Sequence, residues 1–324
     1  MKNFILLLLA SVGAMVWESG AHAQADTYPS KPITIVITFG AGSGSDVVAR
    51  LYAKALKEKL NATAIVDIKP GAAGMIGAQA VARAAPDGYT VLMGSGTVNA
   101  ANYPLFRDRI PYKPADFAVV SVLSTSPATL FATKDLKGET VAALMQEAKN
   151  TGRKLSCGSG NAVTQVACEM LRRKTAADIV NVPYKGNAQS LTDLAGAQIT
   201  LAFADLTAAA PFVARGSIRA VAVPSRNRVA SLPEVKTFAE QGIADFEFLS
   251  WNAIFVPAGT PREVILKLNE AVRHLFAQPE WENLRVSISG ARISGDLNES
   301  QEFVASEIVK WERYVRESGV KGSD

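Results

Sequence analysis

The chain has few of the side chains on which metal centres and many hydrolases depend. Its 324 residues include 2 cysteines and 2 histidines, whereas a structural zinc site needs about four Cys or His ligands. His22 lies near the start of the chain, and His274 lies in a segment with amphipathic helical spacing, where a partly solvated surface position is expected. The sequence therefore predicts no metal site, no cofactor and no histidine-dependent catalysis.

A strong charge of one sign is also absent. The 34 Lys and Arg residues nearly balance the 30 Asp and Glu residues, and the formal net charge is +4. Apart from the run Arg172-Arg173-Lys174, the basic residues are scattered. Nucleic-acid-binding domains usually concentrate them on one face, so no nucleic-acid partner is expected. A hydrophobic share of 48% supports a packed core and excludes wholesale disorder.

Several enzymatic motifs are missing as well. The sequence contains neither the phosphate-binding pattern G-x-x-x-x-G-K-[ST] nor the nucleophile elbow G-x-S-x-G. Gly42-Ser43-Gly44 does not continue into the dinucleotide-binding spacing G-x-G-x-x-G. A secreted serine hydrolase stays open as an alternative, but it would require a base beside a serine. The sequence favours a protein that performs no chemistry.

The first residues have the features of a secretory signal. Lys2 supplies a positive charge, and residues 4–16 form an apolar stretch shorter than the ~20 residues of a membrane span. Ala21-His22-Ala23 matches an A-x-A cleavage site. We therefore expect residues 1–23 to be a signal peptide cleaved after Ala23, and the mature protein to be exported. A membrane anchor is the alternative, which the short apolar core disfavours.

Beyond this segment, short apolar runs alternate with helical patterns, which is typical of an α/β protein. Strands are predicted near residues 33–37, 64–68, 90–93, 118–123, 128–132, 154–157, 179–182, 199–203 and 219–223. Helices are predicted near residues 47–56, 75–85, 140–149, 163–171, 187–195, 261–277 and 299–317. The first helix should be capped by Ser45 or Asp46. The extended residues 118–132 would carry the chain between two lobes.

Three loops share a composition of glycine and small hydroxyl residues. They are residues 40–45, residues 94–97 and residues 158–161, and the first and third precede helices. Glycine lets the backbone turn sharply and approach a ligand, and the free N–H groups at a helix start attract anions. Each loop alone could be only a tight turn. Two such loops in separate halves of the chain predict a two-sided clamp for an anion.

An ordered set of short motifs resembles one family across nearly the whole mature chain. These motifs are Tyr28-Pro29-Ser30-Lys31-Pro32-Ile33, the stretch 69–78 (KPGAAGMIGA), the stretch 85–90 (APDGYT), Val182-Pro183-Tyr184-Lys185-Gly186 and the stretch 255–261 (FVPAGTP). Together they resemble the Bug receptors, the solute-binding proteins of tripartite tricarboxylate transporters. The resemblance implies a periplasmic, two-lobed type II binding protein, each lobe an α/β sandwich. Its ligand would be a small organic acid: a di- or tricarboxylate, an acidic amino acid or an aromatic acid.

The resemblance also indicates where the ligand would lie, because the family grips a carboxylate with its two Gly-rich loops. The predicted ligand-binding residues are Gly40, Ala41, Gly42, Ser43, Gly44, Ser45, Ser95, Gly96, Thr97, Ser159, Gly160, Asn161, Thr164, Gln165, Tyr184 and Asp205. Some of the hydroxyl residues could instead cap helices or bond their own turns. Asp205 could be a helix cap, and Tyr184 and Trp251 could be core residues.

The chain departs from the common family pattern at three places that bear on the ligand. Gly40-Ala41 stands where a proline-containing pair is frequent, Val166 where a histidine is usual, and Asp205 where an asparagine is common. Cys157 and Cys168 could form a disulfide in an oxidising compartment, or could be two buried thiols. The spacing does not decide between these.

The predicted organisation has three parts. Residues 1–23 are the signal peptide, residues 24–122 with 250–324 form lobe one, and residues 123–249 form lobe two. We expect a monomer that delivers a small carboxylate to the membrane components of a tripartite transporter. A periplasmic subunit that senses the same ligand for a membrane kinase is the alternative, since both roles use closure of the lobes.

Overall fold

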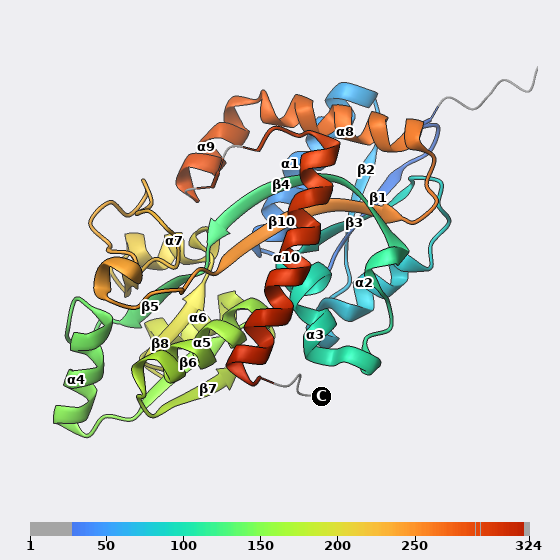
Figure 1. Ribbon diagram of the computed structural model, residues 1–324. Helices are drawn as coiled ribbons and strands as arrows, with labels where there is room; N and C mark the ends of the chain where they lie inside the picture. Colours follow the sequence, from blue (N-terminus) through green and yellow to red (C-terminus); the bar gives the residue numbers. More distant parts are fainter. Residues whose placement is uncertain (1–27, 289, 292, 321–324) are drawn as a thin grey trace, which may run out of the picture.

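The structure is a computed structural model that describes residues 28–320 except residues 289 and 292. The predicted signal peptide and its cleavage site lie outside the described residues. Two five-stranded sheets, each covered by helices, form two lobes that lie side by side (Figure 1). No helix in the described part of the chain has the length and apolar character needed to cross a bilayer.

The first sheet has the strand order β2-β1-β3-β10-β4. Its strands are β1 (Ile33–Ile37), β2 (Ala64–Ile68), β3 (Thr90–Ser95), β4 (Phe117–Pro127) and β10 (Leu249–Pro257). β1 pairs in parallel with β2 and β3, whereas β10 runs antiparallel to β3 and β4. β1 shows why the sheet is covered on both faces, because alternate side chains of a strand point to opposite faces. Ile35 and Ile37 pack with one group of helices, and Val36 packs in another cluster.

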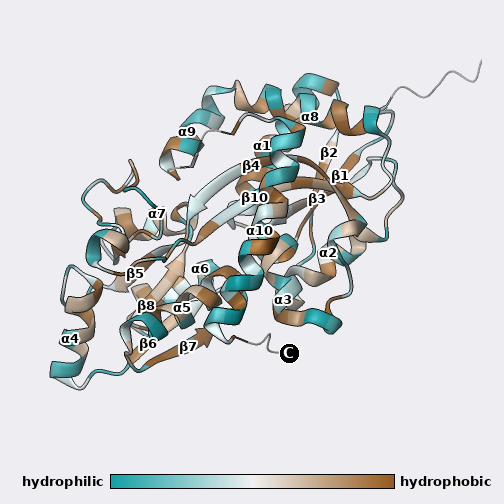
Figure 2. Ribbon diagram, viewed as in Figure 1, coloured by the Kyte–Doolittle hydropathy of each residue, from teal (hydrophilic) through white to brown (hydrophobic). Residues whose placement is uncertain are grey.

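The helices of this lobe divide between those two faces. α1 (Gly44–Leu60) and α8 (Arg262–Phe276) cover one face. α2 (Met75–Ala82), α3 (Asn102–Phe106) and α10 (Leu297–Ser318) contribute to the cluster on the other. A π-helical turn, Thr97–Ala101, joins β3 to α3, and α9 (Pro279–Ser287) follows α8. In Figure 2 the strands are mostly hydrophobic, whereas the helices carry hydrophilic residues as well.

The second sheet has the strand order β7-β6-β8-β5-β9. Its strands are β5 (Thr129–Thr133), β6 (Leu155–Ser159), β7 (Ile179–Pro183), β8 (Leu201–Ala204) and β9 (Ile218–Ala222). Its helices are α4 (Val141–Thr151), α5 (Ala162–Thr175), α6 (Asn187–Ala195) and α7 (Leu206–Ala214). β6 runs parallel to β7 and β8, so the loops after these strands meet at one edge of the sheet.

Two long strands carry the chain between the lobes. β4 and β10 pair antiparallel from Phe117 with Pro257 to Pro127 with Leu249, and the chain enters the second sheet only two residues later, at Thr129. α10 lies across this junction, where Trp311 and Tyr314 pack on Phe248 just before β10. The change of sheet at residue 128 falls after the boundary predicted at 122. The residue boundaries of the two lobes stay a prediction.

The alternation of strands and helices predicted from the sequence is present, with some differences in bounds. The cap of α1 was predicted wrongly: it is Ser43, whose Oγ accepts from the Asp46 N–H, and not Ser45 or Asp46. The helix begins at Gly44, before the two residues that were predicted to cap it, so both of those residues lie inside the helix. Residues 94–95 and 158–159 are the last residues of β3 and β6 rather than loop residues. The helices α3 and α9 and the strand β10 were missed, and α7 was expected only as the helix that Asp205 could cap.

Candidate functional site

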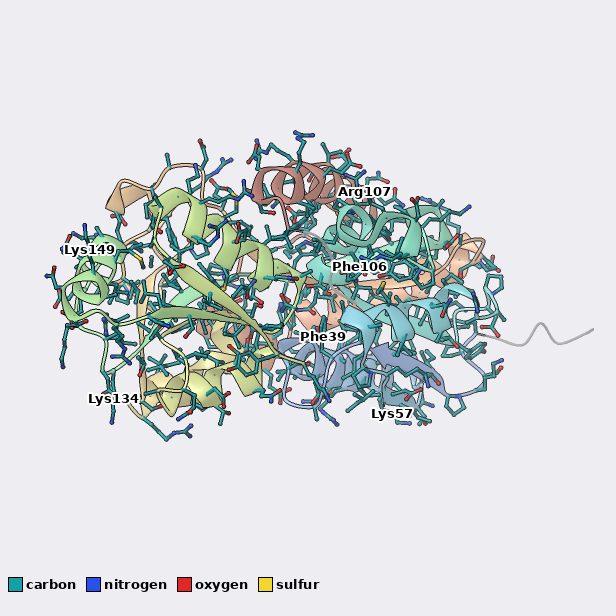
Figure 3. The ribbon with its side chains drawn as sticks, turned by 90° about the horizontal axis from the view of Figure 1, so that it is seen from below. Phe39, Lys57, Phe106, Arg107, Lys134 and Lys149 are labelled. Carbon is teal, nitrogen blue, oxygen red and sulfur yellow. A yellow bond between two sulfur atoms is a disulfide. The ribbon has the colours of Figure 1, made fainter. Side chains whose placement is uncertain are left out.

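A cavity of about 270 Å³ lies between the lobes, near the low end of the range for small-molecule pockets. Figure 3 shows Phe39, one of its lining residues, at the middle of the molecule where the two lobes meet, with Lys134 and Lys149 at the outer end of the second lobe. The first lobe lines it with Phe39, Gly40, Ala41, Ser43, Gly44, Ser45, Val48, Ser95, Gly96, Thr97, Ser124, Ser126, Ser250, Trp251, Asn252 and Ile288. The second lobe adds Gly160, Asn161, Val163, Lys185, Gly186, Asn187, Ala188, Gln189, Asp205, Thr207 and Ala208.

On the first lobe, the loop before α1 is held by a buried carboxylate. Asp46 accepts a hydrogen bond of 2.9 Å from the Gly42 N–H and forms an ion pair of 2.9 Å with Arg50. Gly42 has φ +77°, a conformation that favours glycine. Ser45 donates to Asn252 Oδ1 at 2.6 Å, which ties the start of α1 to β10. These contacts tie the loop to α1 and β10.

Trp251 and Gly96 pack against each other and form part of the cavity lining on the first lobe. Trp251 is 1% exposed, and its Nε1–H donates to Glu307 of α10 at 2.9 Å. Glu307 is itself buried and forms an ion pair with Lys310. A Cβ at Gly96 would lie 3.0 Å from Trp251 Nε1, so glycine lets the β3 loop pack directly on the indole. Trp251 thus lines the cavity and is also a core residue.

On the second lobe, the loop before α5 is stabilised by its own side chains. Asn161 Oδ1 accepts from the Thr164 N–H at 3.0 Å. The Thr164 hydroxyl accepts from the N–H groups of Gly160 at 3.0 Å and Asn161 at 3.1 Å. These two amides were predicted to face the ligand, but Thr164 already occupies them. The remaining first-turn amides of α5 follow Asn161, where Val163 lines the cavity.

A disulfide joins the two elements that flank this loop. Cys157 at β6 and Cys168 in α5 are bonded, with their Cα atoms 5.9 Å apart. Of the two alternatives left open by the sequence, the structure contains the disulfide rather than free thiols. The bond closes a short loop that includes Gly160 and Asn161, so it restrains the part of the second lobe that reaches the cavity.

The loop between β7 and α6 is a third contribution that the sequence reasoning missed. Residues 185–189 all line the cavity. They sit close against the α5 loop, because a Cβ at Gly160 would lie 2.2 Å from the Asn187 nitrogen. The available signal was a glycine followed by asparagine, directly after a strand and before a helix, as in the loops that were recognised.

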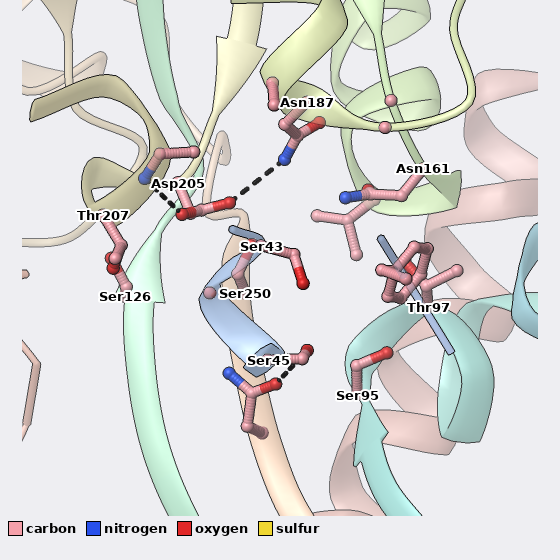
Figure 4. A pocket seen from close by; sticks show the side chains of 18 of the residues that line it. Ser43, Ser45, Ser95, Thr97, Ser126, Asn161, Asn187, Asp205, Thr207 and Ser250 are labelled. Carbon is pink, nitrogen blue, oxygen red and sulfur yellow. Dashed lines mark hydrogen bonds between the residues drawn. The ribbon is translucent and has the colours of Figure 1, made fainter. Parts of the chain in front are cut away.

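Asp205 is the cap of α7, one of the two alternatives that the sequence offered, and it also lines the cavity, where a ligand contact stays a prediction. Its Oδ1 caps α7 by accepting from the Ala208 N–H at 2.9 Å, and Asn187 donates to its Oδ2 at 3.2 Å. It also lines the cavity, where Figure 4 shows its carboxylate beside Asn187 and Thr207. Asp205 and Lys185 are the two charged side chains that line the cavity among the described residues.

Five of the predicted residues do not line the cavity: Gly42, Ser159, Thr164, Gln165 and Tyr184. Ser159 donates to Asn181 at 2.8 Å and is nearly fully buried. Tyr184 turns its hydroxyl to Asp193 at 2.8 Å. Burial, followed by the Asp193 carboxylate, raises the pKa of Tyr184 to about 12. The other predicted residues are brought together around the cavity, and their ligand contacts stay a prediction.

Apart from Asp205 and Lys185, the polar side chains that line the cavity are neutral. Hydroxyl groups of six lining serines and two lining threonines, together with the starts of four helices, α1, α5, α6 and α7, surround it. In the part of the chain that the structure describes, no group of three or more His, Cys, Asp or Glu residues is placed to hold a metal ion. His274 lies on α8 and contacts Glu58 and Gln278, away from the lining residues.

Comparisons with known proteins give consistent results. The family model described as "Tripartite tricarboxylate transporter family receptor" matches residues 48–320. Protein BugT of Bordetella pertussis is 30% identical over 97% of this chain and 98% of its own length. A solved R. palustris protein with adipate is 32% identical, with a TM-score of 0.85, over 91% of this chain and 99% of that one.

Two further solved structures have the same architecture. The periplasmic binding protein BugD is 28% identical, with a TM-score of 0.83, over 91% of this chain and 99% of its own. MatC of Rhodopseudomonas palustris with bound malate is 26% identical, with a TM-score of 0.83, over 89% of this chain and 100% of its own. The two-lobed α/β fold expected from the sequence is therefore confirmed.

Proposed function

The chain belongs to the tripartite tricarboxylate transporter receptor family, and from that premise we propose that it captures a small organic acid in the periplasm for delivery to a membrane transporter. The observation that carries the proposal is the interlobe cavity, at which helix starts from both lobes meet. The adipate and malate in two related structures support a carboxylate ligand. Export through the predicted signal peptide is part of the proposal.

The ligand carboxylate would be held by neutral groups. The free N–H groups in the first turn of a helix carry partial positive charge, which the helix dipole reinforces. α1 from the first lobe and α5 and α6 from the second offer such groups, and serine and threonine hydroxyls add further donors. Lys185, the one cation in the described lining, is largely exposed. Anion binding at helix starts needs no buried cation.

Closure of the lobes would complete the site. β4 and β10 connect the lobes, so a change in a few backbone dihedrals near residues 128 and 249 would move one lobe against the other. A ligand that contacts both lobes favours the closed state by the difference of its affinities for the two states. This is capture without chemistry, since the described lining contains no histidine to serve as the base of a serine nucleophile.

The proposal is tested by measuring binding to a panel of about a hundred organic acids. Saturating ligand at 100 times Kd should stabilise the protein by about 2.7 kcal/mol, which thermal unfolding detects. Gly44→Val places a branched side chain in the cavity opposite Asp205 and should abolish the stabilisation. Gly196→Val, at a position outside the lining residues with only ordinary contacts near its Cβ, is the matched control. If no acid in the panel stabilises the wild-type protein, the proposed function is wrong.

A further inference from the structure

The carboxylate of Asp205 has hydrogen-bonding capacity that the protein does not use. Its two oxygens accept from the Ala208 N–H at 2.9 Å and from Asn187 Nδ2 at 3.2 Å, and both donors are neutral. An ionised carboxylate offers about four lone-pair sites. Because Asp205 lines the cavity, an unused site can accept a hydrogen bond from a bound molecule.

The Asp205 carboxylate lies close to the start of α1, where we propose that the ligand carboxylate binds. Asp205 Oδ1 lies 3.4 Å from the place that a Cβ at Gly44 would take, so the carboxylate is next to the first residue of α1, which belongs to the other lobe. A ligand carboxylate that binds at the start of α1 must therefore lie beside Asp205. Figure 4 shows Ser43, the residue before Gly44, and Asp205 among the side chains that line this pocket.

Two adjacent carboxylates repel each other unless a donor lies between them. This repulsion is stronger in a partly enclosed cavity than in bulk water, because the effective dielectric constant there is lower. A hydroxyl or an ammonium on the carbon next to the ligand carboxylate would be placed to donate to Asp205 and relieve this repulsion. A plain dicarboxylate has no such group, and the cost of placing its carboxylate beside Asp205 is not offset.

We propose that Asp205 makes the site selective for acids that carry a hydrogen-bond donor on the carbon adjacent to a carboxylate, namely 2-hydroxy or 2-amino acids. The inference rests on the proposed function and narrows its ligand class. Hydroxyl and ammonium share the chemistry that Asp205 recognises, and comparison of matched ligands distinguishes them. Asp205 is on this view a specificity-determining residue as well as the cap of α7.

The experiment is calorimetric titration of three four-carbon diacids that differ in one substituent. Succinate has no donor, L-malate has a hydroxyl and L-aspartate has an ammonium at the adjacent carbon. They are compared in the wild type and in Asp205→Asn, which keeps the shape of the side chain and the ability to cap α7. Asp178→Asn removes the same charge from an exposed position outside the lining residues and serves as the control.

In the wild type, the better of L-malate and L-aspartate should bind at least tenfold more tightly than succinate. Asp205→Asn should weaken that ligand by roughly ten- to a hundredfold, the range of a charge-assisted hydrogen bond, and should leave succinate unchanged or bound more tightly. The inference is overturned if succinate binds as well as both donor-bearing acids, or if Asp205→Asn alters all three equally. The same comparison with glutarate, 2-hydroxyglutarate and 3-hydroxyglutarate tests adjacency, because equal affinity for the two hydroxy acids would contradict it.

Failure of this inference differs from failure of the proposed function. Tight binding of plain diacids would overturn the role of Asp205 while leaving carboxylate capture in place. Absence of binding by every organic acid, in the diacid sets and in the wider panel, would overturn both.

Discussion

Replacement of Gly160 by alanine tests whether the two loops of the second lobe form one unit at the cavity. An added Cβ would lie 2.2 Å from the Asn187 nitrogen, 2.3 Å from the Gly186 carbonyl carbon and 2.5 Å from Asn187 Oδ1. Favourable contacts between carbon atoms lie near 3.5–4.0 Å. Two of the three atoms belong to the backbone and cannot rotate away, so residues 186–187 must move by about 1 Å or more.

This displacement has an expected cost in stability and in binding. Overpacking of this kind typically costs about 1–3 kcal/mol. With an unfolding entropy of about 2.1 cal/mol/K per residue, this loss lowers the melting temperature of a chain of this length by roughly 1.5–5 °C. Gly186 and Asn187, which would be displaced, line the cavity, and Asn187 donates a hydrogen bond to Asp205. The affinity for the best carboxylate found in the panel should therefore fall by about tenfold, a loss that corresponds to about 1.4 kcal/mol.

Thermal unfolding and calorimetric titration of the purified variant check both expectations. Gly40→Ala is the control, because Gly40 also lines the cavity but an added Cβ there would meet nothing within 4 Å. It should change stability by less than about 0.5 kcal/mol. The reasoning is refuted if Gly160→Ala matches Gly40→Ala in both melting temperature and affinity.

Four further predictions follow from individual features. Cys157→Ala with Cys168→Ala opens a loop of sequence separation 11 and should lower the free energy of unfolding by about 2.5–3 kcal/mol in urea titrations; an unchanged urea midpoint would contradict this. Glu307→Gln weakens the buried acceptor of Trp251 and should destabilise the protein by about 1–3 kcal/mol, whereas the exposed control Glu312→Gln should have almost no effect. Mass spectrometry of the exported protein should find a mature start at Gln24, and an uncleaved cytoplasmic product would disprove export. Carboxylate affinity should change less than about threefold between low and high salt, because contacts shielded from water are poorly screened, and a steep loss would indicate that exposed cations hold the ligand.

Local sequence patterns determined much of the framework. β-branched runs such as residues 33–37 form strands because their side chains pack well on a pleated surface. Glycine-containing loops precede α1 and α5 as expected, because this local geometry needs small residues, although residues 44–45 belong to α1 and residues 158–159 to β6. The family resemblance also rested on such local motifs, and the family match confirms it.

The composition of the site was decided by tertiary structure. Ser124 and Ser126 of β4 and Ser250 of β10 line the cavity because two distant strands pair in one register, and register determines which face each side chain occupies. Thr164 and Tyr184 were predicted to face the ligand. In the structure, the Thr164 hydroxyl instead accepts from the Gly160 N–H, and the Tyr184 hydroxyl donates to Asp193.

Asp205 shows most clearly which contacts the local sequence determines and which depend on the tertiary structure. The sequence offered a helix cap as the alternative to a ligand contact, and the capping hydrogen bond to the Ala208 N–H is a contact over three residues. Its approach to Gly44 joins residues that are far apart in the chain and belong to different lobes. A local hydrogen bond is encoded by neighbouring residues, whereas a contact across the cavity depends on how the lobes are set against each other by β4, β10 and α10.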